Sequence, residues 1–144
     1  MNILFVCKGN VGRSQMAEVI FNTLSGGKHS VFSAGTAVFD KEGNSRHGQK
    51  IGDMPEAEHV VTCLKEFGFD GAHLVREQLS PEMITRADKV VVMAEQDTLP
   101  DYLKASDKVE YWDVENPKGM SLEKHQEIFN QIHSLVRGLL NTLQ

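Results

Sequence analysis

The sequence has little of what marks disulfide-rich, membrane-spanning or nucleic-acid-binding proteins. Two cysteines among 144 residues are too few for a disulfide scaffold and agree with a reducing compartment, so a cytoplasmic location is the default expectation. No apolar run approaches the roughly 20 residues that cross a bilayer, and no basic leader precedes the N-terminal run, so we expect neither a membrane partner nor a signal peptide. A net charge of -5 disfavours a nucleic-acid partner.

The composition is otherwise that of an ordinary globular protein with one core. Hydrophobic residues make up 40% of the chain and charged residues 24%, with no repeat, linker or low-complexity segment. We therefore expect residues 1–144 to form a single domain. The histidines are scattered without the spacing of metal ligands, so we expect no metal site and no cofactor.

Strand-like and helix-like apolar patterns alternate along the chain. Strands separated by helices favour parallel crossovers with helices on both faces of a sheet, which is an α/β fold of three layers. Gly, Asp, Asn and charged residues fill residues 36–54, which predicts a long surface loop that borders the functional site. The patterns predict strands at 2–6, 30–34, 89–93 and 108–112, and helices at 13–24, 55–68, 80–86, 95–104 and 121–143.

The most informative stretch is Cys7-Lys8-Gly9-Asn10-Val11-Gly12-Arg13-Ser14, which lies between the first strand and the first helix. Its glycines allow backbone N–H groups to turn inward, and with a helix N-terminus those donors form a socket for an anion such as phosphate. The same electropositive setting stabilises a Cys7 thiolate, and the planar fork of Arg13 can bind two phosphoryl oxygens. The spacing predicts nucleophilic attack by sulfur on phosphorus. A buried cysteine beside a surface arginine is the alternative, and it leaves the glycines and Asn10 unexplained.

The segment Val6 to Glu18 resembles the signature of low-molecular-weight protein tyrosine phosphatases and of the related thioredoxin-linked arsenate reductases. The likeness continues in that family's order through nearly the whole chain. It includes Ser33-Ala34-Gly35-Thr36, Gly68-Phe69-Asp70 with His73 and Arg76, Ala87-Asp88, Val90 to Met93, and Asn116-Pro117. The resemblance implies a four-stranded parallel sheet.

The resemblance also implies a role for each residue of the loop. Asn10 would hold the loop open, Ser14 would donate a hydrogen bond to the Cys7 thiolate, and Ser33 and His73 would support that network. On the sequence alone, Ser14 is equally a first-turn helix residue and His73 a structural histidine. Lys8 is either a second cation at the mouth of the socket or a solvated lysine that points away. The expected substrate-binding residues are Lys8, Gly9, Asn10, Val11, Gly12 and Ser14.

The sequence departs from the family where the general acid is expected. Members carry Asp before Pro, whereas this chain has Asn116 before Pro117, and an amide cannot protonate a leaving oxygen. Either Asp113 or Glu115 has taken over as the general acid, or the protein works slowly without one because Asn116 occupies the acid's place; if a carboxylate acts, we expect it to be Asp113. Ala94 stands where the family usually has Asp. Lys118-Gly119 replaces aromatic residues that often frame a phosphotyrosine ring, which weighs against protein phosphotyrosine as the substrate.

Two further functions compete with a phosphatase. Arsenate mimics phosphate, but its reduction passes a disulfide along several cysteines, and the only other cysteine is Cys63 in the apolar stripe of a helix. An arsenate reductase would therefore need an external thiol. A phosphate-binding or phosphoprotein-binding module with degraded activity is the other alternative. The favoured function is a cysteine-dependent phosphomonoesterase with a phosphocysteine intermediate. Its catalytic residues are Cys7, Arg13 and Asp113, and its partner is a phosphorylated small molecule or phosphoprotein.

Overall fold

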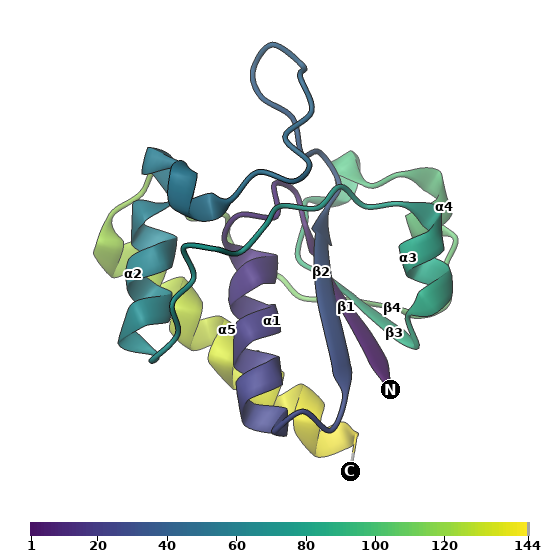
Figure 1. The fold of residues 1–144 in the computed structure, drawn as a ribbon. Coiled ribbons are helices and arrows are strands. Elements are labelled where there is room, and N and C mark those ends of the chain that lie inside the picture. The colour runs from purple at the N-terminus through teal and green to yellow at the C-terminus, as the bar shows by residue number, and fades with distance from the viewer. Residues whose placement is uncertain (144) are drawn as a thin grey trace.

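The computed structural model describes residues 1–143, in which the predicted four-stranded parallel sheet is present (Figure 1). The strands lie in the order β2-β1-β3-β4, and every neighbouring pair is parallel. Their bounds are β1 Asn2–Cys7, β2 Ser30–Gly35, β3 Lys89–Val92 and β4 Val109–Tyr111. Because all four strands run the same way, their carboxyl ends meet at one edge of the sheet, where open α/β sheets bind ligands.

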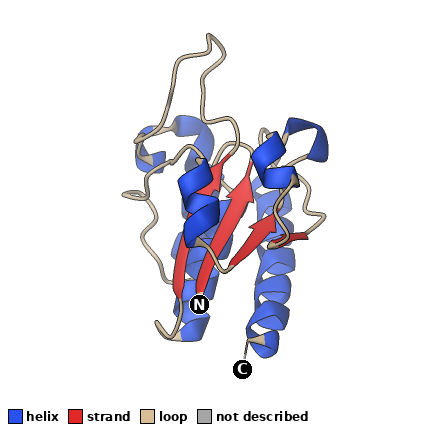
Figure 2. Cartoon of the chain, turned by 90° about the vertical axis from the view of Figure 1, so that its right-hand side faces the viewer, coloured by secondary structure: helices blue, strands red, loops and turns tan. Residues whose placement is uncertain are grey.

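Helices cover both faces of the sheet, as Figure 2 shows, which confirms the three-layer arrangement. Helices α1 (Arg13–Ser25), α2 (Glu58–Glu66) and α5 (Leu122–Thr142) pack on one face. The shorter α3 (Pro81–Arg86) and α4 (Asp101–Lys104) pack on the other. None of these helices, within the part of the chain that the structure describes, is long and apolar enough to cross a bilayer.

Strand β1 joins the two halves of the core. Ile3 and Phe5 face the α1, α2 and α5 side, whereas Leu4 and Val6 face the α3 and α4 side, and all four side chains are fully buried. Alternate residues of a strand point to opposite faces, so a strand covered on both sides must be apolar throughout. The apolar run at the N-terminus has this form, which is why it makes a central strand rather than a helix.

Two of the predicted helices are divided in the structure. The segment predicted as one helix over 55–68 begins with a 3-10 turn at Pro55–Ala57, and α2 follows; another 3-10 turn, Ile51–Asp53, lies at the end of the predicted loop. The segment 95–104 contains a 3-10 turn at Gln96–Thr98 and then the short α4. Pro100 accounts for the second break, since a proline lacks an N–H donor and keeps the residue before it extended, as Leu99 is with ψ 135°.

The predicted surface loop rises well clear of the sheet's carboxyl edge (Figure 1). We call residues 36–50 the protruding loop. Its two arms are joined by an isolated antiparallel bridge between Phe39 and Ser45, and an ion pair of 2.8 Å between Arg46 and Asp40 spans its tip. The loop is therefore an ordered projection beside the carboxyl end of β1.

Candidate active site

The candidate site is the loop from Lys8 to Gly12, between the end of β1 and the start of α1. The end of β2 holds this loop from the side, because the N–H groups of Thr36 and Ala37 each donate at 2.9 Å, to the carbonyls of Cys7 and Lys8. Gly35 makes the approach possible: a Cβ there would lie 2.6 Å from the Lys8 carbonyl oxygen. Only glycine allows the two backbones to approach so closely.

A buried polar network connects the cysteine with the loop. Cys7 is 2% exposed, and its Sγ lies 3.0 Å from Ser14 Oγ. Asn10 Nδ2 donates to Ser14 Oγ at 2.7 Å and to Ser33 Oγ at 3.0 Å. Because Ser14 Oγ already accepts from Asn10, its own proton is available to Cys7, and a thiolate there would accept it. The structure thus brings Cys7, Asn10, Ser14 and Ser33 into one chain of hydrogen bonds.

Asn10 has the conformation that closes this loop. Its φ is 53°, which makes it the single non-glycine residue with a positive φ among residues 1–143, and its side chain is fully buried. Asn10 Oδ1 accepts from the Glu77 N–H at 2.8 Å and from Gln15 Nε2 at 3.2 Å. Asparagine tolerates the left-handed region better than most residues, and four hydrogen bonds hold it there.

His73 does not join this network in the structure. Its side chain is exposed, and its ring lies beside Phe69, with the ring centroids 6.0 Å apart. The groups that donate to Asn10 Oδ1 are instead the Glu77 N–H and Gln15 Nε2. Gln15 Nε2 also donates to the Val75 carbonyl at 2.9 Å. The expected loop-supporting place of His73 is therefore wrong. In the sequence, Gln15 was marked only by its place in the segment Val6 to Glu18; its burial, at 2% exposed, is seen in the structure.

Arg13 is almost fully buried, at 3% exposed, and points to the ends of the neighbouring strands. Its Nη1 donates to the Met93 carbonyl, to the Val114 carbonyl at 3.1 Å, and to Glu95 Oε1 at 3.0 Å. Within residues 1–143 no other atom of this guanidinium is hydrogen-bonded. Its Nε and Nη2 therefore have no protein acceptor, and these are donors that a bound oxyanion can use.

Glu95 is a member of the site that the sequence did not indicate. It lies one residue after Ala94 and forms an ion pair of 3.0 Å with Arg13. Burial raises the pKa of Glu95, but hydrogen bonds from its own N–H and from Arg13, with the charges of Arg13 and Lys8, lower the pKa overall. Glu95 is therefore held as a carboxylate. The side chain of Lys8 is exposed, and its charge acts on Glu95 at the mouth of the loop.

The start of α1 leaves its backbone donors open. Gly12 is the N-cap residue and has no side chain to accept from the first turn, and no acidic residue lies in that turn. The first N–H groups of a helix have no partner within the helix, so they are available to an anion. Gly9, Val11 and Gly12 are partly exposed, which leaves the loop accessible from outside.

The segment expected to supply the general acid passes beside Arg13 through the Val114 carbonyl. Asp113 is exposed, and its carboxylate has no hydrogen-bond partner among residues 1–143. Glu115 is paired with Lys124 at 3.0 Å, and Asn116 Oδ1 accepts from the Lys118 N–H at 3.1 Å. Of the two carboxylates, Asp113 is the one without a competing ion pair.

Cys63 lies in the core, as its place on an apolar helix stripe predicted. It is 3% exposed on α2 and packs within the cluster that includes α1 and α5. Burial, with the nearby charge of Glu66, raises the pKa of the Cys63 thiol to about 11. A thiol in that setting is a poor nucleophile. Among residues 1–143, no three or more His, Cys, Asp or Glu side chains are arranged to hold a metal ion.

The chain is similar to proteins of one superfamily. The sequence profile described as "Low molecular weight phosphotyrosine protein phosphatase" matches residues 2–144. A low molecular weight protein tyrosine phosphatase from T. tengcongensis is 32% identical, with 99% of each chain covered and a TM-score of 0.80. The YwlE arginine phosphatase from Geobacillus stearothermophilus is 26% identical, with 99% of this chain and 92% of that chain covered and a TM-score of 0.79.

Curated relatives carry a different activity in their names. Arsenate reductase 1 of Staphylococcus epidermidis is 27% identical over 135 residues, which are 93% of this chain and 91% of that protein. Arsenate reductase of Staphylococcus aureus is 28% identical over 131 residues, with 90% and 88% covered. The similarities therefore agree on the family and on the fold, and they divide on the reaction.

Proposed function

Because the chain belongs to the low molecular weight phosphotyrosine protein phosphatase family, we propose that it is a cysteine-dependent phosphatase that hydrolyses phosphomonoesters. The observation that carries this proposal is the buried network of Cys7, Ser14 and Asn10, which connects the cysteine with a glycine-containing loop. The substrate class is a phosphorylated small molecule or phosphoprotein, with aryl esters preferred. A reducing compartment such as the cytoplasm suits a nucleophilic thiol.

The first step is an in-line attack of the Cys7 thiolate on phosphorus. An S–P bond forms and the P–O bond to the leaving group breaks, which gives phosphocysteine and an alcohol or phenol that takes up one proton. The hydrogen bond from Ser14 stabilises the thiolate before the attack. Backbone N–H groups of the loop and Arg13 bind the three equatorial oxygens, whose charge is spread in the transition state.

In the second step, water attacks the phosphorus of the phosphocysteine. The S–P bond breaks, inorganic phosphate leaves, and the Cys7 thiolate is restored. Glu95 supports both steps through Arg13, because its carboxylate and the Met93 and Val114 carbonyls hold the guanidinium at the sheet edge. A preorganised cation costs no reorganisation when the charge develops.

The proton for the leaving oxygen is assigned to Asp113. Asn116 cannot supply it, and Glu115 is engaged with Lys124. The exposed carboxylate of Asp113 follows β4 and precedes the Val114 carbonyl that binds Arg13, so it lies in the segment next to the phosphate-binding cation.

The test is steady-state turnover of a chromogenic aryl phosphate. We expect turnover by the wild type, loss of turnover in Cys7→Ser, and retention in Cys63→Ala, which removes the other thiol. Equal loss in both cysteine variants would contradict the assignment of the nucleophile. Binding of inorganic phosphate without turnover in the wild type would support a phosphate-binding module instead.

Arsenate reduction with an external thiol is the second candidate, and the names of the curated relatives favour it. In that reaction two electrons pass from thiols to arsenate, which gives arsenite and a disulfide. Cys63 is poorly suited to form the disulfide because it is buried and its pKa is raised. The test is an assay with arsenate and an added dithiol, run beside the aryl phosphate assay. Formation of arsenite without hydrolysis of the aryl phosphate would favour arsenate reduction over phosphatase activity.

A further inference from the structure

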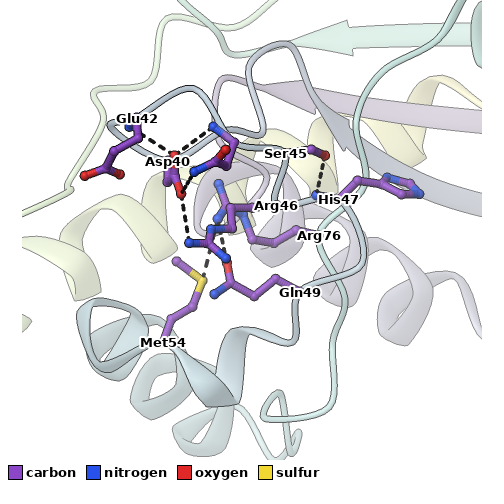
Figure 3. A network of polar contacts seen from close by, with 9 residues as sticks. Asp40, Glu42, Ser45, Arg46, His47, Gln49, Met54 and Arg76 are labelled. Atoms are coloured by element: carbon purple, nitrogen blue, oxygen red, sulfur yellow. Dashed lines mark hydrogen bonds and ion pairs between the residues drawn. The ribbon is translucent and has the colours of Figure 1, made fainter.

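A second buried cation besides Arg13 lies against the loop, at Gly9. Arg76 is 6% exposed, and its Nε donates to the Gly9 carbonyl at 3.0 Å. Figure 3 shows its Nη1 directed at Gln49 Oε1, at 2.9 Å, and at Met54 Sδ, at 3.9 Å. The Arg76 backbone is bound as well, through its N–H to the Gln49 carbonyl at 2.8 Å. The guanidinium is therefore held in one place from several sides.

Arg76 forms no ion pair with a carboxylate in the described part of the chain, although the charge of Glu56 acts on it from beyond ion-pair distance. In the described part of the chain, residues 1–143, the acceptors of its hydrogen bonds are a carbonyl, an amide oxygen and a thioether, and no carboxylate pairs with it. The nearby Arg46 is itself paired with Asp40. A buried charge is costly unless it is hydrogen-bonded and near a charge of opposite sign, so we expect negative groups to act on Arg76.

The charges that act on Arg76 include two negative groups. Burial lowers the pKa of Arg76 most strongly, while negative charge on Cys7 and on Glu56 raises the pKa and the charge of Arg46 lowers it. Of these groups, Cys7 is the one that belongs to the candidate site, at the end of β1 where the loop begins. Arg76 thus contacts the loop at Gly9 and interacts electrostatically with the sulfur at its start.

We propose that Arg76 is a positioning residue of the phosphate loop, which holds the Gly9 carbonyl and supplies a second positive charge that favours the Cys7 thiolate. The Gly9 to Asn10 peptide is planar and trans, so binding its oxygen also sets the direction of the Asn10 N–H. The partial negative charge of that oxygen is directed to a cation instead of a bound oxyanion. The inference rests on the proposed phosphatase function for its purpose, but its test does not require turnover.

The test is the pH dependence of Cys7 alkylation by iodoacetamide, followed on the Cys7 peptide by mass spectrometry. Arg76→Gln keeps a donor for Gly9 and removes the charge; Arg76→Lys keeps the charge and loses the fork geometry. We expect Arg76→Gln to need a higher pH for half-maximal alkylation, with a rate at lower pH reduced roughly tenfold, since a neighbouring opposite charge commonly shifts a titration by a unit or more. Arg76→Lys should retain most of the wild-type profile.

Arg46→Gln is the matched control, because it removes an arginine from the same neighbourhood that is exposed and already paired with Asp40. Its alkylation profile should be that of the wild type. An unchanged profile in folded Arg76→Gln, or an equal displacement in Arg46→Gln, would overturn the proposal. If Arg76→Gln does not fold, Arg76→Met is the second variant that removes the charge: a profile displaced to higher pH supports the proposal, and an unchanged one refutes it. A displaced profile in a protein that turns over no phosphate ester would uphold this role and refute the phosphatase.

Discussion

Substitution of Asn10 by alanine tests the polar network that shapes the loop. The change removes the donors to Ser14 and Ser33 and the acceptor for the Glu77 N–H. It also places an alanine at φ 53°. We expect Asn10→Ala to lower the free energy of unfolding and to slow Cys7 alkylation at neutral pH, because Ser14 loses the bond that orients its hydroxyl.

The magnitude follows from those contacts. A buried N–H left without an acceptor costs about 1–3 kcal/mol, and an alanine in the left-handed region costs about 1 kcal/mol more than a glycine. The sum is about 2–4 kcal/mol, which corresponds to a fall in Tm of roughly 5 to 15 °C for a domain of this size. Chemical denaturation gives the free energy, and a thermal melt gives Tm.

Asn10→Gly is the matched control for that substitution. It loses the same hydrogen bonds but is free of the conformational cost, so it should be about 1 kcal/mol more stable than Asn10→Ala. An Asn10→Ala protein that unfolds within about 0.5 kcal/mol of the wild type, the range of an ordinary surface change, would refute the account of the network.

Three further predictions concern titratable groups. Iodoacetamide at neutral pH should label Cys7 well before Cys63, since burial raises the Cys63 pKa to about 11; equal labelling, read by peptide mass spectrometry, would contradict this. Burial also raises the pKa of Glu18, so the folded protein binds this proton more tightly than the unfolded chain does. The stability of the fold therefore falls as the pH rises from the unfolded pKa of Glu18 through its folded pKa. Glu18→Gln should therefore raise Tm at pH 7, with a gain that vanishes below about pH 4; a pH-independent gain would argue against it. In Asp113→Asn, the rate should depend more steeply on the pKa of the leaving group. A general acid is worth roughly 10² to 10⁴ in rate, and its loss slows esters with poor leaving groups most. If Asn116→Asp instead restores turnover of alkyl phosphates, while Asp113→Asn leaves the leaving-group dependence unchanged, the assignment of Asp113 as the acid is wrong.

The parts of the fold that depend on local patterns could be predicted from the sequence. The strand at the N-terminus is apolar on both faces because both faces are covered, so its pattern was informative by itself. Cys63 could be placed in the core because its neighbours on α2 share an apolar stripe. The sequence also indicated the break in the 95–104 segment, since Pro100 disfavours a helical conformation at the residue before it.

The parts of the site that depend on tertiary contacts could not be predicted in the same way. His73 was expected in the network from the family resemblance, yet the acceptor on Asn10 is satisfied by the backbone of Glu77, which no side-chain pattern shows. Glu95 pairs with Arg13 across 82 positions of sequence. Arg76 likewise contacts Gly9 across 67 positions of sequence, because the fold brings the segment after α2 against the loop.

The central claim is that the Cys7 sulfur attacks phosphorus, and acid quenching during turnover of an aryl phosphate tests it most directly. At acid pH the quenched wild-type protein should carry one phosphate on the peptide that contains Cys7, formed at least as fast as product appears. The Cys63→Ala protein should carry the same phosphate on the same peptide. Turnover without any phosphorylated peptide on a rapid-quench timescale, or with the phosphate on a residue other than Cys7, would contradict the mechanism.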